Sequence, residues 1–551
     1  MVTEINSEDR IPVDCHFKVT AGPGAGKTHW LINHIKNVLA HSDRLGKCGK
    51  IACITYTNVG VDTIVRRLGL ATKGVEVCTI HSFFYNNIVK PYLWLIAVDE
   101  GFNLDLLKGE DDRFDLSYPT LEAIKKENNQ LYATDVFLKL AIRNARWRID
   151  EHGEIVCKPK HAMKANARGT FLSSKTYLAY KKQAWAKGLM HYDDVIYFAY
   201  RLFERIPFIQ EVIARKFPFL FIDEFQDSHP IQVGLIKKLS ERGSIIGVIG
   251  DPAQSIYQFL GADVTQFNTF TLPHLQEYVI SGNRRSTIKI VDFLNSIRRD
   301  LQQVPHRTVQ GEVPVLLVGS HIDNYQKVQE IVETDVYALS YDNLNANSLK
   351  KMMNANAQDK HLIDNIIDLN EERKTVVATY IKALEHAKAK KFKKAFDLLA
   401  RLDVDIKDAV VKIHRLLSSY DDISKMSLYE FYDYLNITFG LSMATLKKGQ
   451  AQTFYNSHQY SQLAMCVNHE DDDGIQRTIH KAKGDEFDNV MVCLGDEKAL
   501  DFFLQPDLLN NESHRVYYVA ASRAKERLFF SIPLLSNGIR KKIEKLGIEI
   551  K

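Results

Sequence analysis

Short apolar stretches, separated by helical patterns, recur along the first half of the chain. The clearest are IACITYT at 51–57, VEVCTIH at 75–81, FPFLFIDE at 217–224 and SIIGVIGD at 244–251. Stretches of this length that are apolar at successive positions are typical of strands buried on both faces of a parallel sheet. The segment VGVDTIVRRL at 59–68 is one of the helical patterns between them. This alternation of strands and helices predicts an α/β fold.

The same alternation returns in the second half of the chain. The predicted strands there are VPVLLVG at 313–319, DVYALSY at 335–341, IQRTIH at 475–480, NVMVCL at 489–494 and RLFFSI at 527–532. We therefore predict two α/β domains, each interrupted by a mostly helical insertion. The predicted boundaries are 1–89 and 189–280 for the first domain, 90–188 for its insertion, 281–350 and 466–551 for the second domain, and 351–465 for its insertion.

Two carboxylates, Asp223 and Glu224, follow the apolar run FPFLFI directly. In an open parallel sheet, ligands bind outside the carboxyl ends of the strands, so both side chains would lie at the ligand edge. The alternative is an acidic strand end that is only solvated. A second signal is needed to choose between them.

That signal is a glycine-rich segment, TAGPGAGKTHW at 20–30, which runs from an apolar strand into a helical pattern. It nearly matches G-x-x-x-x-G-K-T, with Ala21 at the first position. The backbone amides of such a loop turn inward around phosphates, and the helix amino terminus adds its dipole. The predicted nucleotide-binding residues of the loop are Gly22, Gly24, Ala25, Gly26, Lys27 and Thr28. Thr28 and Asp223 would hold Mg²⁺, and Glu224 would orient the attacking water.

The composition narrows the class of protein. The chain has 551 residues, 45% of them hydrophobic and 25% charged, as in soluble proteins of several domains. The net charge of +4 is small, so any nucleic-acid site must be a local groove. The seven cysteines form no C-x-x-C pair, which favours reduced thiols in a cytoplasmic protein. The charged start and the lack of an apolar run of about 18 residues argue against a signal peptide and a membrane span.

Eight ordered motifs resemble those of one known family. They are TAGPGAGKT, ITYTNVGVDTI, CTIHSFF, FIDEFQD, VIGDPAQSIYQFLGA, SGNRRST, RTIHKAKGDEFDNVMV and ESHRVYYVAASRAKERL. In this order they resemble UvrD/Rep/PcrA-type superfamily 1 DNA helicases. The resemblance implies two RecA-like P-loop domains, 1A and 2A, with insertions 1B and 2B. ATP would bind between 1A and 2A, and single-stranded DNA would lie across both.

The resemblance also assigns residues around the phosphates and the ribose. Gln254 would sense the terminal phosphate. Arg285 and Arg523 would bring positive charge to it from the second domain, as an arginine fork stabilises spread negative charge. Glu486 would accept a hydrogen bond from a ribose hydroxyl, although the family's usual leucine before it is Asp485 here.

The residues expected to bind the base of the nucleotide differ from those usual in the family. His29 and Arg284 stand where the family holds adenine between an arginine and a tyrosine, and no glutamine precedes Gly22 to read the adenine edge. Stacking is nearly blind to base identity, so we expect looser nucleotide selectivity than in the repair helicases. The alternative is that a backbone amide within residues 11–17 reads the base.

A further set of residues is implied to bind DNA by stacking and by hydrogen bonds to the backbone. These residues are Tyr56, Thr57, Asn58, Thr79, His81, Tyr257, Phe259, Thr478 and His480. For Tyr257 and Phe259, packing in the core is the alternative. Val59 and Leu260 replace a lysine and an arginine that are usual in the family, which predicts weaker or less salt-sensitive DNA binding.

The insertions carry no recognisable motif. Five lysines of the second insertion, Lys388, Lys390, Lys391, Lys393 and Lys394, could form a duplex-binding face or a solvated helix surface. Two functions stay open. One is an autonomous 3′ to 5′ translocase and helicase, acting on single-stranded DNA or single/double-strand junctions in DNA repair. The other is a subunit that regulates a separate nuclease of the OLD/TOPRIM type, as in Gabija-type antiviral defence.

Overall fold

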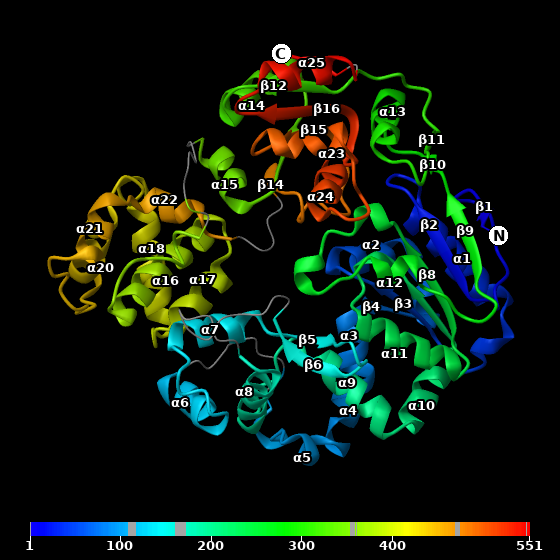
Figure 1. Cartoon of the computed structure of the whole chain (residues 1–551), viewed down its shortest axis with the longest axis horizontal. Coiled ribbons are helices and arrows are strands. Elements are labelled where there is room, and N and C mark those ends of the chain that lie inside the picture. The colour runs from blue at the N-terminus through cyan, green and yellow to red at the C-terminus, as the bar shows by residue number, and fades with distance from the viewer. Residues whose placement is uncertain are drawn as a thin grey trace. The chain divides into compact units, whose positions relative to one another are not determined.

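The computed structural model describes residues 2–107, 109, 117–159, 172–352, 359, 361–468, 474–546 and 548–551 (Figure 1). By its contacts the chain forms two compact units. Unit 1 comprises Met1–Arg285, Arg298–Arg307 and Leu508–Arg515. Unit 2 comprises Ser286–Ile297, Thr308–Asp507 and Val516–Lys551. Both α/β regions predicted from the sequence are present, one in each unit.

Unit 1 is built on a seven-stranded sheet in the order β1-β9-β2-β8-β7-β3-β4. All its strand pairs are parallel. The strands are β1 (Thr3–Glu4), β2 (Phe17–Ala21), β3 (Ile51–Thr55), β4 (Val75–Thr79), β7 (Phe219–Ile222), β8 (Ile245–Gly250) and β9 (Gln276–Ile280). The predicted buried parallel sheet is therefore confirmed.

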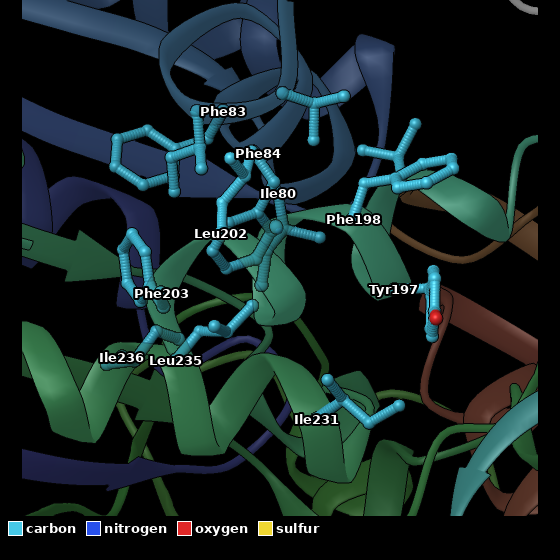
Figure 2. Packing of buried hydrophobic residues seen from close by; sticks show 14 of the residues in the cluster. Ile80, Phe83, Phe84, Tyr197, Phe198, Leu202, Phe203, Ile231, Leu235 and Ile236 are labelled. Atoms are coloured by element: carbon cyan, nitrogen blue, oxygen red, sulfur yellow. The ribbon is translucent and has the colours of Figure 1, made fainter. Parts of the chain in front are cut away.

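Strand β7 shows why its sequence is apolar at every position. Phe219 and Phe221 join the hydrophobic cluster that includes residues of helices α1 (Lys27–His41) and α2 (Asn58–Leu68). Leu220 and Ile222 point the other way, into a cluster with helices α9 (Asp194–Arg205) and α11 (Pro230–Glu241). Because successive side chains of a strand alternate between faces, a strand covered on both faces must be apolar throughout. Figure 2 shows side chains of α9 and α11 in the second cluster.

Other helices of unit 1 extend this second cluster or lie in the segment predicted as the first insertion. They are α3 (Ile80–Phe84), α4 (Lys90–Tyr92), α5 (Ala97–Glu100), α6 (Tyr118–Glu127), α7 (Asp135–Asn144), α8 (Ser174–Ala186), α10 (Phe208–Lys216) and α12 (Thr265–Asn268). A hairpin, β5 (Arg146–Ile149) with β6 (Ile155–Lys158), pairs antiparallel among them. A short parallel pair, β10 (Gly282–Asn283) with β11 (Val304–Pro305), also belongs to this unit.

Unit 2 contains a six-stranded parallel sheet in the order β14-β13-β15-β16-β12-β17. Its strands are β12 (Val315–Val318), β13 (Val336–Ser340), β14 (Gln476–Thr478), β15 (Phe487–Cys493), β16 (Ala524–Ile532) and β17 (Glu549–Ile550). The helices of this α/β part are α13 (Ile288–Ile297), α14 (His321–Ile331), α15 (Asn343–Lys351), α23 (Asp501–Leu504), α24 (Glu512–Ala521) and α25 (Asn537–Glu544). The first residues of α24 belong to unit 1 and its last residues to unit 2.

A helical region with its own hydrophobic cluster completes unit 2. Its helices are α16 (Glu371–Lys388), α17 (Phe392–Ala400), α18 (Ile406–Ser418), α19 (Tyr420–Ile423), α20 (Leu428–Phe439), α21 (Gln450–Ser457) and α22 (Tyr460–Met465). Parts of both predicted insertions lie outside the described residues. None of the helices in the described part of the chain combines the length and the apolar character that crossing a membrane requires.

Candidate nucleotide and DNA sites

The glycine-rich loop of unit 1 links β2 to α1, as its sequence predicts. Gly24 and Gly26 have φ angles of 73° and 82°, in the left-handed region that favours glycine. A Cβ added to Gly24 would lie 2.8 Å from Asn283 Oδ1, and one added to Gly22 would lie 2.5 Å from Gln303 Nε2. The loop therefore needs glycine both for its backbone turn and for the close approach of its neighbours.

Lys27, the first residue of α1, carries the one charged side chain of this loop. Its side chain is 11% exposed, and Nζ is buried without a hydrogen-bond partner among the described residues. The nearest carboxylate oxygen, Glu224 Oε1, lies 4.0 Å away. A buried ammonium that lacks a hydrogen-bond acceptor is costly by itself. The phosphates of a nucleotide would supply both the acceptors and the opposite charge.

The residues after β7 are fixed in an unusual conformation. Glu224 has a φ angle of 55°, which a non-glycine residue rarely adopts and which is common at functional sites. Its backbone N–H donates to Asp223 Oδ1 at 2.9 Å, and Gln226 Nε2 donates to its Oε2. Asp223 is itself buried. These two carboxylates therefore belong to an ordered turn, which argues against a merely solvated strand end.

A chain of hydrogen bonds connects Glu224 to Gln254, which follows the neighbouring strand β8. Gln226, which contacts Glu224, accepts from the backbone N–H of Asp251 at 3.0 Å. Asp251 Oδ2 in turn accepts from Gln254 Nε2 at 2.6 Å. Gln226 was missed in the sequence analysis, although it stands two residues after Glu224. The two predicted catalytic side chains are thus positioned by one buried network.

Beside the loop lies a cavity of about 340 Å³. Its lining residues are Glu4, Ile5, Asn6, Ser7, Asp9, Ala25, Ile280, Ser281, Gly282, Arg284, Val304 and His306. The N-terminal segment of this lining is thus 4–9, whereas the sequence had suggested 11–17 as the alternative reader of the base. Ser7 is 2% exposed, and its Oγ has no hydrogen-bond partner among the described residues.

Of the two residues expected beside adenine, Arg284 lines the cavity and His29 is not among its lining residues. Arg284 lines the cavity, and its backbone N–H donates to Gly24 O at 2.9 Å. His29 Nε2 instead lies 2.9 Å from Glu8 Oε1. Arg285 belongs by its contacts to unit 1, although the sequence had assigned it to the second domain. Its backbone N–H donates to Asn283 Oδ1 at 2.9 Å, which holds it close to the loop.

Aromatic residues lie at the end of the loop that carries Gln254 and just beyond it. The Tyr257 ring stacks on Tyr56, with centroids 5.2 Å apart and planes at 16°. Phe259 lies 6.1 Å from Tyr257 and is 60% exposed, so the core-packing alternative is wrong for Phe259. Burial, followed by the nearby carboxylates of Asp227 and Glu224, raises the pKa of Tyr257, so its phenol is neutral near pH 7. Neutral rings suit stacking against bases.

Tyr56 also lines a second cavity, of about 310 Å³. The other lining residues are Thr79, Ile80, His81, Arg146, Trp147, Tyr192, Asp193, Ile196, His229, Gln232 and Ala262. The rings of His81 and Tyr192 stack with centroids 3.7 Å apart and planes at 5°. The sequence analysis missed Tyr192 and Trp147. The segment HYDDV, with an aromatic residue directly before paired carboxylates, was the available signal for Tyr192.

Asp194 fixes Trp147, one of the aromatic residues that line this cavity. Trp147 Nε1 donates to its Oδ1 and Trp185 Nε1 to its Oδ2, both at 2.9 Å, and Lys181 Nζ lies 2.8 Å away. Burial alone would raise the pKa of Asp194, but Lys181 and His191 lower it below its ordinary value. The carboxylate therefore stays charged and holds Trp147 in the lining of the cavity.

Three further predicted DNA residues lie at the amino ends of helices. The hydroxyl of Thr57 accepts from the backbone N–H of Gly60 at 3.1 Å, and Thr79 accepts from Ser82 at 3.2 Å. Both threonines are thus N-caps of the helices that follow them. Asn58, the first residue of α2, is exposed.

In unit 2, Thr478 and His480 lie at the carboxyl end of β14 and just beyond it. The His480 ring packs edge-on against Tyr341, which follows the neighbouring strand β13, with centroids 6.2 Å apart. Tyr341 was missed, although it directly follows a predicted strand. Thr478 is buried, His480 is partly buried and Tyr341 is exposed. All three lie at the carboxyl ends of strands of the second sheet, where ligands of parallel sheets bind.

The remaining predicted nucleotide residues also belong to unit 2. Arg523 is buried, and its Nε donates to Val519 O at 3.0 Å. Glu486 is exposed. The charge of Asp485, which departs from the family pattern, is matched by Arg477 at 2.8 Å. The Arg477 guanidinium also lies over the ring of Phe487 at 5.1 Å, so this departure has a local partner.

Comparisons with known proteins agree with these two units. The model of the UvrD/REP helicase N-terminal domain matches residues 5–274, and that of the UvrD-like helicase C-terminal domain matches residues 281–534. ATP-dependent DNA helicase PcrA of Bacillus subtilis is 28% identical over 285 residues, which are 50% of this chain and 36% of PcrA.

Two further relatives show the same limited coverage. PcrA of Staphylococcus epidermidis is 25% identical over 347 residues, which are 61% of this chain and 44% of that protein. ATP-dependent DNA helicase srs2 of Schizosaccharomyces pombe is 26% identical over 353 residues, or 60% of this chain and 38% of that protein. The match thus spans less than half the length of each relative.

Proposed function

The chain belongs to the UvrD/Rep family of helicases, and from this premise we propose that it is an ATP-dependent translocase and helicase on single-stranded DNA. Its named relatives are ATP-dependent DNA helicases. The observation that carries the proposal is one loop of unit 1. Within a few residues it holds Gln254, linked to Glu224 through Asp251 and Gln226, and Tyr257, stacked on Tyr56.

The proposed nucleotide site combines the glycine loop, Lys27 and the β7 carboxylates. The buried Nζ of Lys27 would bind the terminal phosphates, which supply the acceptors it lacks within the described residues. Thr28 and Asp223 would hold Mg²⁺, since a hydroxyl and a single carboxylate together with phosphate oxygens suit this ion. When bound, Mg²⁺ would neutralise charge that develops on the phosphates.

The hydrolytic step is assigned to residues of this chain. Glu224, held in its turn by Gln226, would orient water for in-line attack on the terminal phosphate. Gln254 would contact that phosphate, and Arg285 and Arg523 would stabilise the spreading charge. Glu486 would accept from the ribose, and the cavity with Ser7 and Arg284 would take the base.

The proposed DNA site combines the aromatic group with the second cavity of unit 1. Tyr257, Phe259 and Tyr56 would stack bases, and the cavity beside His81 and Tyr192 would take a further base or sugar. Stacking is tolerant of sequence, as a translocase requires. In unit 2, Thr478 and His480 would contact the same strand. The family resemblance suggests movement in the 3′ to 5′ direction.

Steady-state ATP hydrolysis with and without a single-stranded oligonucleotide tests the proposal. We expect the oligonucleotide to raise kcat at least about tenfold, because stacking on Tyr257 would act on Gln254 through a shared loop. Duplex with a 3′ single-stranded tail should be unwound in preference to duplex with a 5′ tail. Hydrolysis that ignores DNA of either kind would contradict the proposal and leave a nucleotide switch as the better assignment.

A second function, regulation of a separate nuclease of the OLD/TOPRIM type, has one observation in its favour. Val59 stands where the family usually has a lysine, and it is 66% exposed at the start of α2. The loss of a positive charge there would weaken the hold on phosphates. Strong DNA-stimulated hydrolysis that appears only after a nuclease subunit is added would favour this function over autonomous unwinding.

A further inference from the structure

Two buried arginines of unit 1 contact the loop Asp251–Gln258. One contacts Asp251 and the other contacts Ser255. Arg298 Nη1 lies 2.7 Å from Asp251 Oδ1, and both side chains are 0% exposed. Arg515 is equally buried, and its Nε donates to Ser255 O at 2.7 Å. Neither arginine was singled out by the sequence, and each is far in sequence from the loop.

Arg298 acts on the nucleotide end of the loop through Asp251. The Asp251 carboxylate uses Oδ1 for Arg298 and for the backbone N–H of Ala253, and Oδ2 for the side chain of Gln254. The guanidinium is fixed in turn by Asp300, whose two oxygens accept from its Nε and Nη2 at 3.0 Å each. The orientation of Gln254 therefore depends on a carboxylate that Arg298 immobilises.

Arg515 acts on the DNA end of the same loop. Its Nη1 donates to the carbonyl oxygens of Leu508 and Leu509 at 3.0 Å and 3.2 Å. Glu512 adds a contact, because its Oε1 accepts from the backbone N–H of Gln258 at 2.9 Å. The carbonyl that Arg515 holds belongs to Ser255, two residues before Tyr257. Residues on both sides of Tyr257, Ser255 and Gln258, are thus held by side chains of the segment 512–515.

Both arginines lie where the chain passes from one unit to the other. Arg298 directly follows Ile297, the last residue of α13 and of a segment that belongs to unit 2. Arg515 is followed within α24 by Val516, which also belongs to unit 2. Each arginine is therefore joined by one peptide bond to a residue of unit 2.

We propose that Arg298 and Arg515 are positioning residues that join the nucleotide sensor Gln254, the DNA platform Tyr257 and the chain leading into unit 2. The inference rests on the proposed function of Gln254 and Tyr257. When DNA stacks on Tyr257, the loop moves. Because Arg298 and Arg515 hold the loop at two points, its residues move together, and the movement changes the position of Gln254. The same contacts pass the shift along the covalent chain into α13 and α24.

Stability alone is a poor explanation for this arrangement. Burying two charges costs desolvation energy that their attraction only partly offsets, and apolar pairs of similar volume are often as stable or more stable. A buried, multiply hydrogen-bonded arginine does, however, fix geometry closely, because its planar fork holds several acceptors at once. Arg298 forms an ion pair with Asp251 and hydrogen bonds with Asp300, and Arg515 donates to carbonyl oxygens of two segments.

The test compares variants that keep the fold but loosen the loop. The double variant Asp251→Asn/Arg298→Gln removes both buried charges together, so no lone charge is left. Arg515→Lys keeps the charge but cannot hold Ser255 and Leu508 at once. Arg299→Gln is the matched control, since Arg299 is exposed and adjacent to Arg298.

For each variant we measure the melting temperature, KM for ATP, and kcat with and without a saturating single-stranded oligonucleotide. In the double variant and in Arg515→Lys, we expect KM to stay within about twofold of wild type. We expect the DNA-stimulated kcat to fall about tenfold and the ratio of stimulated to basal kcat to fall with it. Arg299→Gln should match wild type throughout.

The outcomes separate this inference from the proposed function. If wild type itself shows no DNA stimulation, the proposed function fails. If DNA stimulates wild type while the double variant and Arg515→Lys both keep the wild-type ratio of stimulated to basal kcat, only the coupling role of the arginines is overturned. Should the double variant melt well below wild type, Arg515→Lys alone decides: a retained ratio overturns the inference, and a lost ratio with normal melting supports it.

Discussion

At the scale of single residues, the catalytic assignment depends on Lys27 and Glu224, whose side chains approach to 4.0 Å. Lys27→Ala should abolish nucleotide binding, because it removes the buried cation of the loop. Glu224→Gln should still bind ATP but hydrolyse it about 10²-fold more slowly or worse, because an amide cannot accept the proton of the attacking water. Single-turnover hydrolysis and a fluorescent nucleotide measure the two effects. Glu241→Gln, on exposed helix surface, is the control.

A second residue-scale prediction concerns the exposed ring of Phe259. Phe259→Ala should weaken the apparent affinity for single-stranded DNA by about 1–3 kcal/mol, the usual value of one lost stack. Its exposure means that the melting temperature should not change. Phe208→Ala removes a similarly exposed ring elsewhere in unit 1 and is the control. Equal DNA affinity in both variants would remove Phe259 from the proposed DNA site.

His34 of α1 provides a prediction of pH dependence. Its ring stacks on Trp30 at 5.2 Å, and both ring nitrogens are buried without hydrogen-bond partners among the described residues. Burial lowers its pKa from 6.5 to about 4. The unfolded chain therefore binds more protons between these values, and the free energy of unfolding should fall as the pH drops from 6.5 toward 4.

The size of this effect is about 3 kcal/mol for one group across the whole window. His34→Leu should reduce the loss of stability by about 2 kcal/mol, most of that amount, when denaturant unfolding is compared at pH 7 and pH 4.5. His41→Leu changes an exposed histidine of the same helix and is the control. A pH dependence in His34→Leu equal to that of wild type would contradict the assignment.

At the scale of elements, the candidate sites collect at the carboxyl ends of parallel strands. Asp223 follows β7, Asp251 follows β8, and Tyr56 follows β3, three strands that are neighbours in the sheet. Because parallel strands place these ends at one edge, residues distant in sequence become neighbours. The glycine loop follows β2, the next strand beyond β8.

The β14–β15 connection of unit 2 gives an element-scale prediction. Asp485→Leu restores the residue usual in the family but deprives Arg477, a mostly buried side chain, of its ion pair. We expect the melting temperature to fall by about 2–4 °C, the shift that roughly 1 kcal/mol produces in a domain of this size. Adding Arg477→Leu should recover most of the loss. A stable Asp485→Leu single variant would show that the pair contributes nothing.

At the scale of the whole molecule, the sequence predicted the two parallel sheets because buried strands must be apolar on both faces, as in β7. The glycine loop was predictable because its spacing is local. Gln226, Arg298 and Arg515 were not, because their partners come together only through the fold. Trp147 was missed for the same reason, since Asp194 joins it to Trp185 of a separate element.

The most direct test of the central claim is movement along single-stranded DNA. Oligonucleotides carrying biotin and streptavidin at either the 5′ or the 3′ end are incubated with the protein and ATP, and release of streptavidin is followed over time. A 3′ to 5′ motor is predicted to displace streptavidin from the 5′ end, to depend on ATP, and to lose this activity in Glu224→Gln. Release from neither end, with ATP hydrolysis intact, would contradict the account.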